Sequence, residues 1–197
     1  MALEKGIRHV TTDWDAALRD LTEPQSNAVA LILTPIREIE VVANLLAVQE
    51  QDVWVVPTFA GVTVYMQVET AAEDDINALL GESRPMPGAA EDLAMQMSFM
   101  APVVLVVSWL GKEHSAEPGV SGQITARRYV GGKFDKDMPA GLIISTADDT
   151  VEKLLLGDVT PGERDGVDVS KIDRAGALKY LQDAMSGMVP GDNEDEI

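Results

Sequence analysis

The clearest pattern of hydrophobic and polar positions along the chain lies between residues 27 and 69. Residues 28–34 form a short apolar run without charge, which is typical of a central strand buried on both faces. Apolar positions then recur at helical spacing and predict an amphipathic helix over 36–50. Thr34 is the expected cap of this helix, because its hydroxyl can accept a hydrogen bond from a free backbone N–H.

Two strands follow this helix in the predicted order. Residues 53–58 form a second apolar run, and Pro57 implies a sheet edge or a strand end because proline cannot donate a ladder hydrogen bond. Ala60-Gly61 predicts the turn. Residues 62–69 then alternate strictly between apolar and polar side chains, so we expect one face in the core and one face in contact with water.

The next elements complete a recurring topology. Residues 71–80 and 89–99 predict helices, and residues 102–109 predict a strand as apolar as the first. Together with the preceding elements, this order is β-α-β-β-α-β, the order of a ferredoxin-like fold. The fold class is therefore predicted as α+β with a mixed or antiparallel sheet, in which strands 28–34 and 102–109 are adjacent and central. A separate helix is expected over 12–21.

Additional strands and helices are expected to elaborate this core in the C-terminal half. The predicted segments are a loop over 111–122, a strand over 123–130, a loop over 131–141, a strand over 142–145, a helix over 149–156 capped by Ser145 or Thr146 and ended by Gly157, a polar stretch over 158–168, and a helix over 169–185 capped by Ser170. We expect one domain over 1–186, with its core at 27–109 and its elaboration at 110–186. Residues 187–197 are expected to form an acidic disordered tail.

The composition supports a folded domain and excludes sites that need cysteine. The chain has 197 residues, is 46% hydrophobic and contains no cysteine, so it has neither disulfides nor thiolate metal sites. We place Leu46 and Val104 in the core. No secretory signal or spanning segment is visible, and we expect a cytoplasmic protein. His9 and His114 are the only histidines, and a metal or cofactor site is not expected.

The acidic residues are too abundant to mark a site by themselves. Asp74-Asp75 and Asp148-Asp149 lie at the starts of predicted helices, where carboxylates are stabilised by the helix dipole. The sequence contains no P-loop, dinucleotide-binding or hydrolase motif. No catalytic residue is therefore predicted.

Charge adds one local feature to this picture. The net charge of −18 argues against binding to nucleic acid or to an anionic membrane. Against this background, Arg127, Arg128, Lys133 and Lys136 lie within ten residues that hold a single acid, Asp135. Guanidinium groups bind carboxylates and phosphates, and the adjacent Gly131-Gly132 could let backbone N–H groups approach an anion. Neutralisation of neighbouring acids explains the same pattern.

Two functional hypotheses follow. The first is a non-enzymatic interaction or regulatory protein that acts through contacts with a protein partner or through self-association. The second is an enzyme or sensor that binds a small phosphorylated or carboxylated ligand through Arg127, Arg128 and Lys133. A pocket that gathers these basic side chains would favour the second hypothesis.

Removal of residues 188–197 should leave the fold intact, because this segment contains almost no apolar surface to bury. We expect the truncated protein and the full chain to have the same melting temperature by circular dichroism. Loss of folded protein on truncation would show that the segment packs against the domain.

Overall fold

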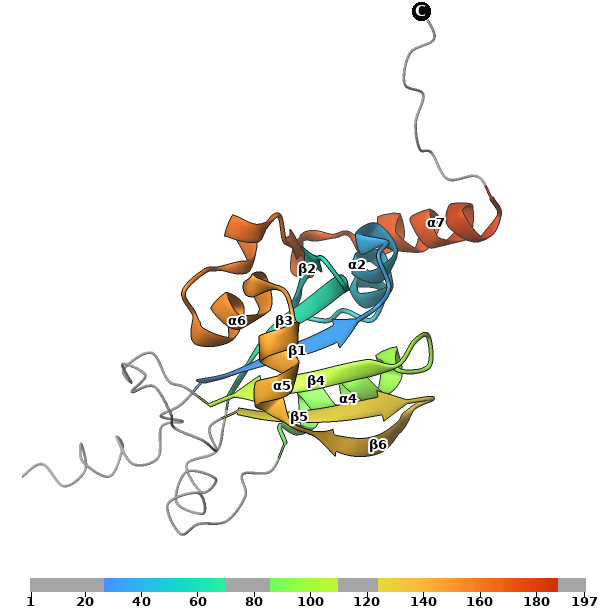
Figure 1. Cartoon of the computed structure of the whole chain (residues 1–197). Helices are drawn as coiled ribbons and strands as arrows, with labels where there is room; N and C mark the ends of the chain where they lie inside the picture. The colour runs from blue at the N-terminus through green and yellow to red at the C-terminus, as the bar shows by residue number, and fades with distance from the viewer. Residues whose placement is uncertain (1–26, 70–85, 110–123, 188–197) are drawn as a thin grey trace, which may run out of the picture.

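The strands form an antiparallel sheet in the computed structural model, which describes residues 27–69, 86–109 and 124–187 (Figure 1). The seven strands are β1 (Asn27–Thr34), β2 (Trp54–Thr58), β3 (Gly61–Glu69), β4 (Val103–Ser108), β5 (Ile124–Val130), β6 (Lys133–Met138) and β7 (Val167–Asp168). They lie in the order β6-β5-β4-β1-β3-β2-β7, and each neighbouring pair is antiparallel. The architecture is therefore α+β, as the sequence predicts.

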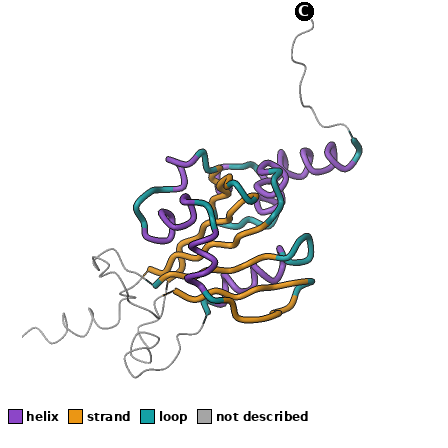
Figure 2. The backbone as a smooth tube through the Cα atoms, in the orientation of Figure 1, coloured by secondary structure: helices purple, strands orange, loops and turns teal. Residues whose placement is uncertain are grey.

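Helices cover both faces of this sheet (Figure 2). One face carries α2 and α4, with α7 packed against α2, whereas the other face carries α5 and α6. The bounds are α2 (Ile39–Val48), α4 (Gly88–Met97), α5 (Ala140–Thr146), α6 (Asp149–Leu156) and α7 (Arg174–Met185), with 3-10 helices η1 (Pro161–Arg164) and η2 (Val169–Lys171). Within the described ranges, no helix is long and apolar enough to cross a membrane.

Strand β1 lies at the centre of the sheet, between β3 and β4. Ala30 and Ile32 belong to the hydrophobic cluster under α2 and α4, and Leu31 belongs to the cluster under α5 and α6. All three side chains are fully buried. The prediction that segments 28–34 and 102–109 are adjacent and central is therefore confirmed.

The first described helix begins later than the sequence indicates. The predicted helix spans 36–50 with Thr34 as its cap, but α2 begins at Ile39, and Thr34 is the last residue of β1. Thr34 Oγ1 accepts a hydrogen bond from the Ile36 N–H (3.2 Å), while the Ile36 carbonyl accepts one from the Val62 N–H (2.7 Å). Because Ile36 is bonded to the start of β3, its carbonyl is not used in a helix.

The sequence predictions after β5 are wrong in two places. Residues 131–141, predicted as a loop, contain strand β6, which follows a turn at Gly131-Gly132 with positive φ values of 58° and 78°. No hydrophobic alternation marks β6, because its side chains are exposed or only half-buried on both faces. Residues 142–145, predicted as a strand, lie in helix α5. An apolar run this short does not distinguish a helix from a strand.

The C-terminal helix is also shorter than predicted. The sequence places it over 169–185 with Ser170 as its cap, but α7 begins at Arg174, and the side chain of Asp173 caps it. Ser170 lies in η2, one turn earlier. The polar stretch 158–168 contains η1 and strand β7, and β7 pairs with β2 at the opposite edge of the sheet from β6.

Helix α6 agrees with its predicted bounds, although its cap differs. It ends at Gly157, which adopts the left-handed conformation (φ 74°) typical of a helix terminus. The cap is Asp148, whose side chain accepts a hydrogen bond from the Thr150 N–H, and not Ser145 or Thr146. An Asp at this position satisfies a free N–H and also interacts favourably with the helix dipole.

Several sequence predictions lie outside the described residues. These are the helices over 12–21 and 71–80, the loop over 111–122, the acid pair Asp74-Asp75, both histidines (His9 and His114), and the tail from residue 188 onward.

The alternation of residues 62–69 is only partly reflected in exposure. Thr63, on the predicted water-facing side, is buried and lines a small apolar cavity with Val151 of α6. Tyr65 on the same side is half-buried, and Gln67 is exposed. The expected water-facing side is therefore open only toward the end of β3.

Replacement of Leu46 by alanine should lower the free energy of unfolding by about 2–4 kcal/mol, because this α2 side chain is 1% exposed and its removal leaves a cavity. Val104, which the sequence also placed in the core, is only half-buried, so Val104→Ala should cost less. Urea denaturation with an unchanged m value measures both. Wild-type stability of the Leu46→Ala protein would contradict the observed position of α2.

Candidate functional site

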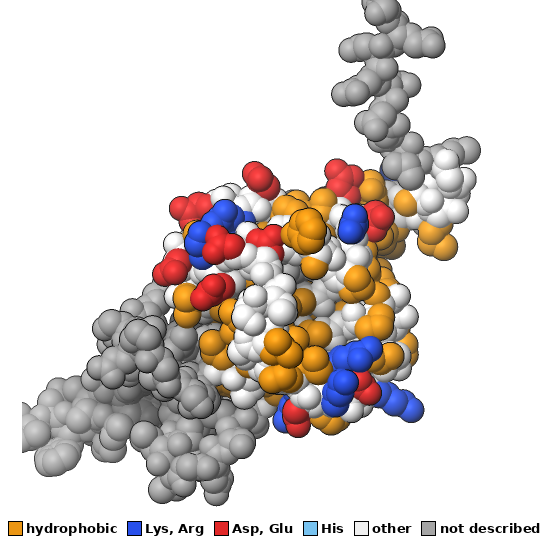
Figure 3. Space-filling view, in the orientation of Figure 1, with side chains coloured by type: hydrophobic (Ala, Val, Ile, Leu, Met, Phe, Trp, Pro, Cys, Tyr) orange, Lys and Arg blue, Asp and Glu red, His pale blue; other side chains and the backbone are white. Residues whose placement is uncertain are grey.

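The predicted basic residues lie at the β5–β6 end of the sheet. Figure 3 shows Lys and Arg side chains gathered there with an acidic side chain between them. Arg127 and Arg128 are successive residues of β5 and therefore point to opposite faces. Lys133 is the first residue of β6, beyond the turn. The structure thus places the three residues near one edge without bringing them together around one cavity.

Arg127 is fixed on the α4 face by two carboxylates and a ring. Its Nη1 donates to Glu91 Oε1 of α4 at 3.0 Å, and its Nε donates to Asp137 Oδ1 of β6 at 3.1 Å. Its guanidinium carbon also lies 5.5 Å from the centroid of the Phe134 ring. Arg127 therefore joins α4, β5 and β6 and is already paired with two acids.

The buried Tyr129 extends this network. Its hydroxyl donates to the same Glu91 Oε1 at 2.7 Å, and its ring meets Phe134 edge to face with centroids 6.1 Å apart. Burial and the hydrogen bond to Glu91 both raise the pKa of Tyr129, because they disfavour the tyrosinate. Sequence analysis missed Glu91 and Tyr129. The sequence indicated only that Tyr129 shares a sheet face with Arg127, because side chains alternate along β5. Nothing in the sequence pointed to Glu91.

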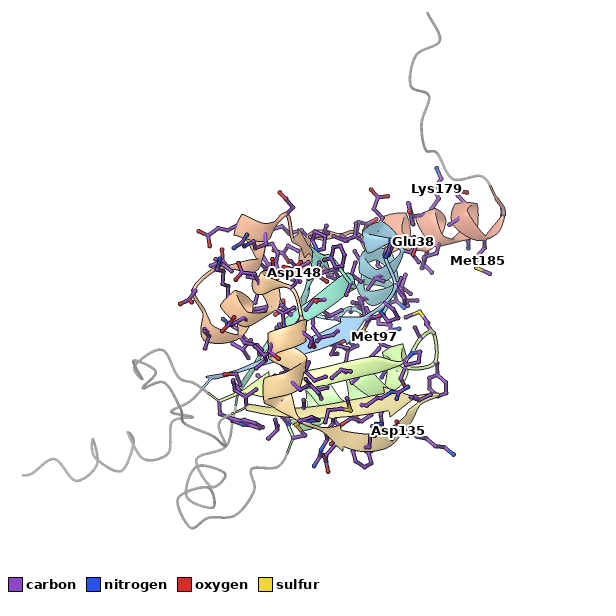
Figure 4. All side chains as sticks on the ribbon, in the orientation of Figure 1. Glu38, Met97, Asp135, Asp148, Lys179 and Met185 are labelled. Atoms are coloured by element: carbon purple, nitrogen blue, oxygen red, sulfur yellow. The ribbon has the colours of Figure 1, made fainter. Side chains whose placement is uncertain are left out.

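Arg128 lies on the opposite sheet face from Arg127, and its contact with an acidic side chain is longer. Its Nε lies 3.7 Å from Asp135 Oδ2, which is longer than a hydrogen bond. The β5–β6 register shifts between Arg128 and Tyr129, and Lys136 stands directly opposite Arg128. Two cations therefore stand opposite each other in the β5–β6 pair. Asp135, which is labelled on β6 in Figure 4, makes the long contact with Arg128.

The two turn glycines have a structural role. The Gly131 N–H donates to the Ser98 carbonyl at 2.9 Å, and the Gly132 N–H donates to Ser98 Oγ at 2.8 Å. The positive φ of Gly132 favours glycine at this position, and a Cβ there would also displace the exposed Phe99 ring, which lies 2.1 Å from where that atom would be. Both N–H groups are thus used to attach the turn to the end of α4, and they do not point to a bound anion.

Exposed apolar side chains surround this turn. Phe99, Met100, Val130 and Phe134 are between 40% and 74% exposed. Lys133 and Lys136 are also exposed, and neither makes an ion pair with any described residue. Within the described ranges no strand pairs with the outer side of β6. We call these six residues, Phe99, Met100, Val130, Lys133, Phe134 and Lys136, the β6 edge surface.

The acid pair Asp148-Asp149 has a local structural explanation. The Asp148 side chain accepts hydrogen bonds from the N–H groups of Thr150 and Phe59, which lower its pKa, and Asp149 pairs with Lys153. The interpretation of Asp148-Asp149 as helix-start acids is therefore confirmed. Among the described residues, no three carboxylate or histidine side chains are grouped closely enough to hold a metal ion.

Replacement of Tyr129 by phenylalanine should lower the free energy of unfolding by about 1 kcal/mol near neutral pH, because one hydrogen bond to Glu91 is lost. The pKa of Tyr129 is raised in the folded state, so its contribution is complete below its unfolded pKa of about 10 and is lost as pH rises further. The stability difference between wild type and Tyr129→Phe should therefore shrink above pH of about 10. Urea unfolding at a series of pH values measures this difference, and a pH-independent difference would contradict the network.

Comparison of the chain with protein-family models, with curated proteins and with solved structures gave no match. Among the described residues, the β6 edge surface combines exposed apolar side chains, lysines without an acidic partner and an unpaired strand edge.

Proposed function

We propose that this protein is a non-enzymatic interaction protein that binds a partner protein through the β6 edge surface. The observation that carries the proposal is the exposure of Phe99 and Phe134 beside Lys133 at the end of an edge strand. Large aromatic side chains exposed in a cluster favour a binding role, because they lose contact with water when a partner covers them.

The charge of this edge supports a partner of acidic character. The chain carries a net charge of −18, whereas Lys133 and Lys136 lie on the outer strand without an ion pair to the described residues. An extended acidic segment could pair its backbone with β6 and place carboxylates beside the two lysines. The apolar side chains around the turn would then contact the apolar residues of that segment.

A second proposal concerns the unit that presents this edge. We propose that residues 27–108 form a ferredoxin-like unit. The antiparallel order β4-β1-β3-β2 supports this, as does the position of α2 and α4 on one sheet face. The β5–β6 hairpin then extends the sheet of this unit beyond β4. The proposed binding edge, β6, is therefore the strand at the end of the extended sheet.

A small-anion site is the second candidate function, and the geometry around Arg128 favours it over Arg127. Arg128 lies opposite Lys136 and is separated from Asp135 by 3.7 Å, so its guanidinium retains hydrogen-bonding capacity. Arg127, in contrast, already donates to two carboxylates. A phosphate or carboxylate ligand would therefore contact Arg128 and Lys136, and not the full set Arg127, Arg128 and Lys133.

The partner can be captured by a photoreactive phenylalanine analogue placed at Phe99 in the native host. The same analogue at Leu178 of α7, which is exposed on a different element, is the matched control. We expect a partner protein to be crosslinked to the analogue at position 99. The analogue at position 178 should give no crosslink to that protein. Capture of a second copy of this chain would identify the interaction as self-association, and equal crosslinking at both positions would contradict the proposal.

Binding of the captured partner should weaken about 3- to 30-fold in the Lys133→Ala/Lys136→Ala variant, as expected for the loss of two exposed ion pairs. Calorimetry at two salt concentrations measures this loss, which should be smaller at high salt. Lys179→Ala, which removes an exposed lysine from α7, should bind like wild type. Undiminished affinity of the double variant would contradict the proposed edge.

The small-anion site is tested with inorganic phosphate. Saturable binding of phosphate that is abolished by Arg128→Ala would favour this second candidate function.

A further inference from the structure

A cleft lies at the edge of the sheet opposite β6, where β2 and β3 meet η1. Its volume is about 370 Å³, and its lining includes Trp54, Tyr65, Gln67, Asp52 and Pro161. Because it is formed by other strands, it is separate from the β6 edge surface. The proposed function does not use it.

One wall of the cleft is aromatic. Trp54 of β2 and Tyr65 of β3 are direct cross-strand partners, so their side chains lie next to each other on the same sheet face. Both are half-buried, which leaves part of each ring accessible. The Gln67 Nε2 donates to the Tyr65 hydroxyl at 3.2 Å and adds a polar group beside the rings.

The other wall, formed by residues 160–162, is held in place by hydrogen bonds within its own segment. The Thr160 N–H and Oγ1 both donate to Glu163 Oε2, at 2.7 and 2.8 Å, and the first of these bonds belongs to the capping box at the start of η1. The Gly166 N–H donates to the Pro161 carbonyl at 3.0 Å, and a Cβ at Gly166 would lie 2.5 Å from that oxygen. Pro161 is buried. The cleft is therefore preformed, as ligand sites usually are.

The charges around the cleft favour a cation. Asp52 supplies an exposed carboxylate, and none of the lining residues is basic. Lys171 lies just outside the lining, with its ammonium 5.7 Å from the Trp54 ring centroid and 3.0 Å from Asp168 Oδ2. An ammonium group of the chain itself thus already lies over this ring, and the net charge of −18 attracts cations from solution.

We propose that this cleft binds a small organic cation, whose ammonium group lies against the Trp54 and Tyr65 rings and is balanced by the Asp52 carboxylate. An anionic ligand would meet Asp52 without a basic residue in the lining. Aromatic rings attract ammonium groups through their negative faces, and a nearby carboxylate adds direct charge attraction. Gln67 is placed to bond a hydroxyl or carbonyl on the same ligand.

Choline is a suitable probe, and 3,3-dimethyl-1-butanol is its uncharged counterpart of the same shape. Each is titrated into the full-length protein while the Trp54 indole N–H is followed by NMR, after assignment of that signal with Trp54→Phe. We expect choline to shift the Trp54 signal saturably and the neutral alcohol to leave it unchanged. Equal shifts from both probes, or no shift from choline, would overturn the proposal.

Asp52→Asn tests the role of the carboxylate without a change of shape, and Asp52 is exposed, so the fold should tolerate the change. We expect it to weaken choline binding by about threefold or more. Asp92→Asn removes the same charge from the exposed side of α4 and should have little effect. Lys171→Gln should bind choline more tightly, because a competing cation is lost. Equal weakening by Asp52→Asn and Asp92→Asn would show attraction by net charge alone and would overturn the site.

Discussion

The pairing of β1 on both sides is the constraint on which the rest of the structure depends. Its side chains are buried on both sheet faces, so α2 and α4 must cover one face and α5 and α6 the other. An entirely apolar strand does not determine its own register, since a shift by one residue exchanges one apolar side chain for another. The alternation in β3 supplies this information, because Val64 must enter the core while Gln67 remains exposed. The alternation of apolar and polar residues in β3 therefore determines the register in which β3 pairs with β1.

The two edges of the sheet are built differently, and the difference separates two surfaces. At one edge, β2 is partly covered by the two-residue strand β7, and the adjacent loop forms an aromatic cleft. At the other edge, β6 has six residues and exposes Lys133 and Lys136. Lysine on an edge strand opposes indiscriminate pairing with other chains but allows pairing with an acidic segment. The bonds of Arg127 and Tyr129 to Glu91 attach β5 to α4, and the bond of Arg127 to Asp137 joins β6 to the same network.

Much of the central fold could be predicted because burial leaves a strong signal in the sequence. The apolar run 28–34 and the alternation of 62–69 reflect the faces that they bury, whereas β6 has no buried face and resembles a loop. The site was harder to predict. The cluster of basic residues was visible, but its partners were not, since Glu91 lies 36 residues before Arg127 and meets it only in the folded sheet. The Trp54–Tyr65 wall likewise depends on a cross-strand register and on a loop far along the chain.

Hydrogen exchange followed residue by residue, with and without the captured partner, tests the central claim that the core around β1 is closed and that the partner covers the outer edge of β6. The amides of Leu31 and Ile32 in β1 should exchange slowest, because they are buried between two paired strands. The outward amides of β6 should exchange fast in the free protein and slow down when the partner is bound. Fast exchange in β1 would contradict the observed core. Partner-induced protection that leaves β6 unchanged would contradict the proposed role of β6 in binding.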